Sequence, residues 1–156
     1  MSFLDADRDT KERQSPNAEY HHVLGKDSTQ YYKGQLVAID LDDGKLVGAT
    51  AGDLTLMVLG RCEENVLTGT SNTRRIKVKS GRFYYNSGAD AEAITVAKRG
   101  QDCYVIDDQT VGLSGNNGAN ARAGKIYDVD SYGVCVEIEP FAQGLRGATG
   151  PTGPTG

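Results

Sequence analysis

Glycine occupies every third position from residue 144 to residue 156, in the run GLRGATGPTGPTG, and Pro151 and Pro154 each follow a glycine. In a collagen triple helix three polyproline-like chains wind together, and only glycine fits where each chain crosses the shared axis. One chain cannot form this structure, so the register predicts a homotrimer or a bundle of threes. The alternative is a flexible Gly/Thr/Pro linker. The glycines in register are Gly144, Gly147, Gly150, Gly153 and Gly156.

The collagen-like run is short for a structure that has to hold three chains together. At about 3 Å per residue it spans roughly 40 Å, which is too few triplets to act unaided. Either a domain upstream forms the trimer, or the run is the first part of a longer collagen-like fibre. Both interpretations make the rest of the chain a trimeric base.

Length and composition divide the chain into one domain and two tails. With 156 residues and a formal net charge of −4, the chain has room for one domain and does not favour nucleic-acid binding. It has no apolar run long enough to span a membrane and no signal-peptide core at its start, so we expect synthesis in a cell's cytoplasm. We divide it into residues 1–19, a β-rich domain over 20–140, and a linker with the collagen-like tail over 141–156.

The first segment, residues 1–19, is polar and alternates in charge. After the initial methionine, Phe3 and Leu4 are its only large apolar residues. Such a segment buries too little apolar surface to offset its ordering entropy, so we expect disorder in isolation. It is either an unstructured terminus or an arm that orders on a partner. In the second case Phe3 and Leu4 are its anchors, and Asp5 and Arg8 are the first of its charged contacts.

Short apolar runs separated by turn residues fill the middle of the chain. Turn signals recur roughly every ten residues, which is typical of an antiparallel β-sandwich or small barrel, and we therefore predict an all-β fold. Asp43-Gly44 predicts a hairpin, and the run 54–62 predicts a central strand buried on both faces. Residues 91–101 are the only plausible helical piece. The predicted strands cover 20–24, 35–40, 54–62, 74–88, 103–107, 109–113, 125–130 and 132–138.

A row of basic residues alternates with apolar ones in the strand predicted over 74–88. Arg75, Lys77 and Lys79 share one face, and Ile76 and Val78 share the other. The basic row either contacts an acidic partner or is a solvated sheet edge that lysines protect from pairing. Glycine 81 predicts a bulge or turn within the run.

No pattern in the sequence predicts catalysis. A nucleophile elbow, a phosphate-binding Walker loop and a zinc-protease motif are all missing. The pair Asp107-Asp108 suits turn chemistry, although a hydrolase that uses these acids is an alternative. His21 and His22 are adjacent on a predicted strand and so face opposite ways. We predict buried, reduced thiols at Cys62, Cys103 and Cys135, and we expect no enzyme activity, cofactor or metal.

Five segments follow one another in a recognisable order. They are YYKGQLVAIDLDDGKLVGAT, VLGRCEE, RRIKVKSGRFYYNSG, GQDCYVIDDQTV and AGKIYDVDSYGVCVEI. In this order they resemble the capsid decoration, or head cement, proteins of bacteriophages, over about residues 20–138. Each motif alone consists of turn glycines and strand alternation, and the ordered set is much more specific than any one of them.

The resemblance implies a function as well as a fold. Such proteins form trimers on the outer surface of an icosahedral head, at three-fold positions, where they clamp subunits of the major capsid protein. It also implies that residues 1–19 are a capsid-binding arm. The collagen-like tail departs from the simplest members and suggests a projecting fibre. The alternative is the trimeric base of a collagen-like tail fibre or adhesin, for which the pairs Tyr31-Tyr32 and Tyr84-Tyr85 are the candidate aromatic platform.

Overall fold

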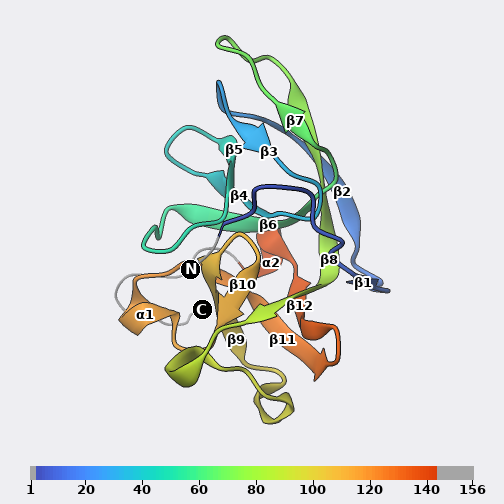
Figure 1. Ribbon diagram of the computed structural model, residues 1–156, viewed down its shortest axis with the longest axis vertical. Coiled ribbons are helices and arrows are strands. Elements are labelled where there is room, and N and C mark those ends of the chain that lie inside the picture. The colour runs from blue at the N-terminus through green and yellow to red at the C-terminus, as the bar shows by residue number, and fades with distance from the viewer. Residues whose placement is uncertain (1–2, 144–156) are drawn as a thin grey trace.

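The computed structural model describes residues 3–143, without the side chains of Asn117 and Gln143, and the fold is all-β as predicted (Figure 1). The collagen register lies outside these residues. In chain order the strands are β1 (Glu12–Arg13), β2 (Glu19–Leu24), β3 (Gln30–Tyr31), β4 (Leu36–Asp40), β5 (Lys45–Gly48), β6 (Leu56–Cys62), β7 (Val66–Leu67), β8 (Arg75–Ser87), β9 (Asp102–Asp107), β10 (Thr110–Gly112), β11 (Arg122–Asp130) and β12 (Gly133–Ile138).

Strand β8 organises the whole fold. It is 13 residues long and pairs with five other strands. Its first half, up to Ser80, pairs with β2 on one edge and with β6 on the other. From Gly81 onward it pairs with β12, β1 and, in parallel, β10. Gly81 has a φ of 144° and marks the change of partners, and β8 continues through it without the turn that is the alternative to a bulge.

The second half of β8 belongs to a closed β-barrel. β8 pairs with β12, β12 with β11, β11 with β9, and β9 with β10, which returns to β8. This barrel is the lower half of the molecule in Figure 1. Its core is filled by residues that include Phe83, Tyr85, Val105, Ile126 and Val136, all of which are buried. Closure of the ring leaves the barrel without a free edge strand.

The first half of β8 belongs to a smaller sheet with β2, β4, β5 and β6, in the upper half of Figure 1. A second core cluster lies here, around Tyr31, Leu46 and Ile76. Strand β4 serves both cores, because Leu36 packs in the barrel cluster and Val37 in the smaller one. The two sheets therefore form one continuous structure.

Most of the strand predictions are confirmed, with ends shifted by one or two residues. The hairpin at Asp43-Gly44 joins β4 to β5, where Asp40 pairs with Lys45. β6 is buried along nearly its whole length, as expected for a central strand. The turns at 107–109 and 130–132 join β9 to β10 and β11 to β12.

The helix predicted over 91–101 is wrong. That stretch forms two short 3-10 turns, η1 (Asp90–Glu92) and η2 (Val96–Lys98), and neither has a side-chain cap. The β-branched run Ile94-Thr95-Val96 disfavours a continuous helix. The carboxylate of Glu92 instead accepts hydrogen bonds from the loop at Ser114. The described residues also contain two single-turn helices, α1 (Gly115–Gly118) and α2 (Pro140–Gln143).

Candidate interaction surfaces

The N-terminal segment is bound to its own domain along most of its described length. The backbone N–H of Leu4 donates to Asp108 Oδ1 over 3.0 Å, and the N–H of Arg8 donates to the Lys33 carbonyl over 2.8 Å. The carboxylate of Asp7 accepts from the Lys33 N–H over 2.9 Å. Residues 4–8 thus lie over the β9–β10 turn and the loop before β4.

Arg8 points into the domain rather than outward. Its guanidinium donates to the Tyr84 carbonyl over 2.9 Å and to the Asn86 side chain over 3.2 Å. It also lies over the ring of Tyr85, with 5.4 Å between the guanidinium carbon and the ring centroid. Burial lowers the pKa of Arg8 from its ordinary value. Its side chain therefore holds the segment against the barrel.

Thr10 and Gly34 form a close contact between this segment and the domain. The buried hydroxyl of Thr10 donates to the Gly34 carbonyl over 2.6 Å. Gly34 has a φ of 92°, and a Cβ added to it would lie 1.9 Å from the carbonyl oxygen of Arg8. The segment can approach this closely only because residue 34 is a glycine.

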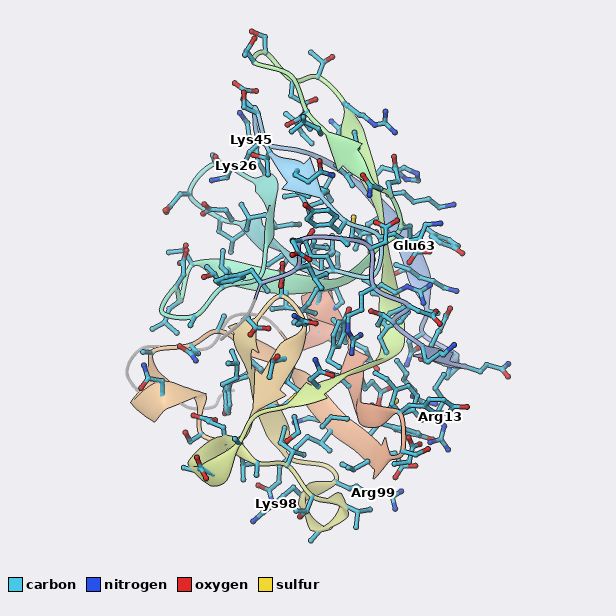
Figure 2. All side chains as sticks on the ribbon, in the orientation of Figure 1. Arg13, Lys26, Lys45, Glu63, Lys98 and Arg99 are labelled. Atoms are coloured by element: carbon cyan, nitrogen blue, oxygen red, sulfur yellow. The ribbon has the colours of Figure 1, made fainter. Side chains whose placement is uncertain are left out.

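Beyond Thr10 the segment becomes part of the sheet. The Lys11 carbonyl accepts from the Tyr84 N–H over 2.9 Å, and Glu12 and Arg13 of β1 pair with β8. Arg13 also forms a 2.7 Å ion pair with Asp128, on the same side of the barrel as Arg99 (Figure 2).

The prediction of disorder is therefore wrong for residues 4–13. The physical reason is that β8 leaves backbone groups unpaired on one edge, between its β6 and β10 partners, and the segment satisfies them. Of the four residues predicted to anchor an arm, Phe3 is 49 % exposed and Asp5 is exposed. Leu4 is half-buried, and the Arg8 side chain is bound to Tyr84 and Asn86 of the barrel. Phe3 and Asp5 therefore face outward at the start of the described segment, and Asp9 and Lys11 are exposed further along it.

A second surface is the basic face of the β2–β8–β6 sheet. Arg75, Lys77 and Lys79 share it, as the alternation predicts, and cross-strand pairing places Tyr20 opposite Lys79. The ammonium groups of Lys77 and Lys79 lie 4.3 Å and 5.1 Å from the centroid of the Tyr20 ring. Tyr20 itself is 53 % exposed. The face is therefore a tyrosine ring flanked by cations.

Acidic residues neutralise part of this basic face. Glu12 forms a 2.6 Å ion pair with Lys79 and a 3.4 Å pair with Arg61 of β6. This contact raises the pKa of Lys79. The interpretation of the basic row as a protected sheet edge is wrong, because β8 has paired strands on both of its edges. Within residues 3–143, no acidic side chain forms an ion pair with the ammonium group of Lys77 or the guanidinium group of Arg75, although the Lys77 backbone N–H donates to Glu64.

A third surface lies where the described chain ends. A groove of about 410 Å³ runs between the segment before β2 and the turn of α2. Phe141 stands beside it, 70 % exposed, with its ring centroid 5.9 Å from that of His21. His21 Nε2 is within 3.1 Å of the Ser80 hydroxyl, and burial lowers the pKa of His21. The groove is lined by Pro16, Asn17, Ala18, Glu19, Ser80, Glu139, Pro140, Phe141 and Ala142.

The acids considered for catalysis have structural roles. Asp107 and Asp108 are both buried, and the main cavities of the described part are lined by other residues. Asp107 accepts from the Gln109 N–H, which is the predicted turn chemistry. Asp108 accepts from Leu4 and from the Gln35 side chain, and burial raises its pKa.

The cysteines are buried free thiols, as predicted. Burial raises the pKa of Cys62 and of Cys135 to about 11, so both remain protonated at neutral pH. Residues 3–143 contain no group of three or more His, Cys, Asp or Glu side chains placed to hold a metal ion. No helix in the same range is both long and apolar enough for a membrane crossing.

The aromatic platform that would favour an adhesin is not formed by the predicted pairs. Tyr31 and Tyr85 are fully buried, and Tyr84 is 5 % exposed. The exposed tyrosines are Tyr20 and Tyr132, at 53 % and 62 %. Sequence reasoning missed both of them, because exposure depends on which face of each strand meets the core. The groove beside α2 was missed as well, since it joins residues distant in the sequence.

Comparison of the chain with family models, with curated protein sequences and with solved structures finds no match. What this protein does has therefore to be inferred from its sequence motifs and from the three surfaces described above.

Proposed function

We propose that this chain is a structural virion protein that binds the outer surface of a phage head. Three copies sit at a three-fold site, stabilise the capsid and project a collagen-like fibre. The observation that carries the proposal is the collagen register beginning at Gly144, directly after the last turn of a compact β-domain. Residues 20–138 resemble decoration proteins in the order of their motifs, and this resemblance is the reason for proposing that the chain assembles on a phage head.

The proposed partners are the major capsid protein and two further copies of the chain. In this proposal it acts without an enzyme activity, a cofactor, nucleic acid or a membrane. Phe3, Leu4 and Asp5 contact the capsid, while residues 7–13 hold that contact site on the barrel. A contact site held by a folded domain loses less conformational entropy on binding than a free arm. Three such sites in one trimer also add through avidity, so each single contact can be weak.

Sedimentation with phage heads tests the proposal. The full chain is mixed with emptied, mature heads of the phage whose genome encodes it, and heads of an unrelated phage serve as the control. We expect saturable binding to the cognate heads, with density at three-fold sites in electron micrographs. A chain that stays in the supernatant would refute the proposal, and binding to host cells instead would favour the tail-fibre or adhesin alternative.

A single substitution tests the contact site. Phe3→Ser removes a half-exposed aromatic ring and is expected to weaken head binding by at least about tenfold, since a buried Phe contributes roughly 1.5–3 kcal/mol. Leu41→Ser is the matched control, because Leu41 is similarly exposed, at 46 %, and belongs to the β4–β5 turn rather than to the N-terminal segment. Equal binding by the two variants would exclude Phe3 from the contact.

A further inference from the structure

The first glycine of the collagen register follows α2 without a spacer. α2 ends at Gln143, and Gly144 is the next residue. Within a triple helix each glycine lies at the common axis. An extended chain spans at most about 3.3–3.6 Å per residue, so a triple helix that began at Gly144 would have its axis within roughly 11 Å of Phe141. Three copies joined in this way would bring their α2 turns together.

The surface around α2 has the character of an uncovered contact. Phe141 is the most exposed large apolar side chain in residues 3–143, at 70 %. The open groove beside it has apolar walls at Pro16, Ala18 and Ala142 and polar walls at Asn17, Glu19, Ser80 and Glu139. A large exposed aromatic group next to such a mixed groove fits the make-up of protein interfaces, in which an apolar centre is surrounded by a polar rim.

The groove is fixed by contacts from several parts of the chain. Asn17 Nδ2 donates to Glu139 Oε2 over 3.1 Å, which ties the segment before β2 to the end of β12. His21 packs against Phe141 on one side and reaches the Ser80 hydroxyl on the other. The surface is therefore already shaped before any partner arrives, which lowers the entropic cost of docking.

We propose that the groove and α2 together form the subunit interface, and that its occupant is a second copy of this chain. The three-fold axis runs beside α2, and Phe141 of each copy packs against the groove face of its neighbour. This inference rests on the trimer of the proposed function and adds the surface that makes it. It also assigns different residues to different partners, with the α2 face for other copies and Phe3, Leu4 and Asp5 for the capsid.

The mass of the full chain in solution tests this interface. We expect the wild-type chain to be a trimer. Phe141→Ser removes apolar area from the contact, so this variant should dissociate into monomers at a protein concentration at least about tenfold higher. Leu67→Ser is the matched control, because Leu67 is 67 % exposed on β7, away from α2, and should leave the trimer unchanged. Thermal unfolding of each variant shows whether the fold is retained.

Cross-linking gives a second, independent measurement. The native cysteines are buried, so a bis-maleimide reagent should react with a cysteine introduced on the surface in preference to them. Ala142→Cys is expected to give covalent dimers within the trimer, and Thr70→Cys, an exposed site elsewhere, is expected to stay monomeric on the denaturing gel.

Two outcomes would overturn the interface. One is a trimer that neither Phe141→Ser weakens nor Ala142→Cys cross-links, which would place the contact on another surface and leave the trimer itself intact. The other is a wild-type chain that is monomeric at every concentration tested. Failure of the proposed function is distinguishable from both, because sedimentation with heads measures it separately.

Discussion

Two tyrosines in this protein are fully buried, and their hydroxyl groups have different contacts. Tyr31 donates to the Leu46 carbonyl and accepts from the Lys26 N–H, so its hydroxyl is fully used. Tyr85 is equally buried, yet its hydroxyl has no hydrogen-bond partner among the described residues. Burial without a hydrogen bond costs free energy, whereas a satisfied hydroxyl contributes to stability.

Removing each hydroxyl should therefore have opposite effects. Tyr85→Phe keeps the ring under Arg8 and is expected to leave the free energy of unfolding unchanged or raise it by about 1 kcal/mol. Tyr31→Phe, which leaves a buried carbonyl unpaired, should lower it by about 1–3 kcal/mol. Urea unfolding of both variants measures the difference. Equal losses would mean that the Tyr85 hydroxyl has a partner.

At the scale of elements, the N-terminal segment is bound to the domain and contributes strand β1 to its sheet. Leu4, Arg8 and Thr10 bind loops and strands from three different parts of the sequence. These contacts depend on the close approach of Arg8 to Gly34. The segment should therefore be as sensitive to residue 34 as to its own residues.

Gly34→Ala is expected to release the segment. The added methyl group would overlap the Arg8 carbonyl, and the backbone would be strained at a φ of 92°, so we expect a loss of about 2–4 kcal/mol. Hydrogen exchange at the Arg8 and Thr10 amides should increase in the same variant.

Gly44→Ala is the control for this prediction. Gly44 has a φ of 75° but no atom within 4 Å of an added Cβ, so only the backbone term of about 1 kcal/mol applies. Matching losses in the two variants would show that the segment does not need Gly34. Unchanged hydrogen exchange at Thr10 in Gly34→Ala would show the same.

At the scale of the whole molecule, the barrel and the smaller sheet share strands. β8 runs through both, and β4 and β6 place alternate side chains in the two cores. Elements that share strands cannot unfold separately without breaking each other's backbone pairing. We therefore expect a single cooperative transition.

Substitutions in the two cores test this cooperativity. Val78→Ala in the smaller core and Val136→Ala in the barrel should each cost about 1–3 kcal/mol and shift the same transition. Calorimetry of the wild type should give equal calorimetric and van't Hoff enthalpies. Two transitions, with each substitution moving only one of them, would contradict the shared-strand description.

Local chemistry accounts for what could be predicted from the sequence. Strand positions follow from alternation along β8 and from apolar runs such as β6, and the hairpin at Asp43-Gly44 follows from its turn residues. The burial of Cys62 and the turn role of Asp107 are likewise local properties. The helix predicted over 91–101 is disfavoured by the β-branched run Ile94-Thr95-Val96, and Glu92 instead bonds to a loop more than 20 residues away.

The sequence by itself determined that this protein is built of short antiparallel strands, and it carries the register that motivates a trimer. Only the tertiary structure decided that residues 4–13 bind the domain, that β10 closes a barrel on β8, and that Phe141 stands beside an open groove. The physical reason is the distance along the sequence over which each interaction acts. Turn propensities and strand alternation act between neighbours, whereas an unpaired strand edge or a close glycine contact exists only after distant segments have come together.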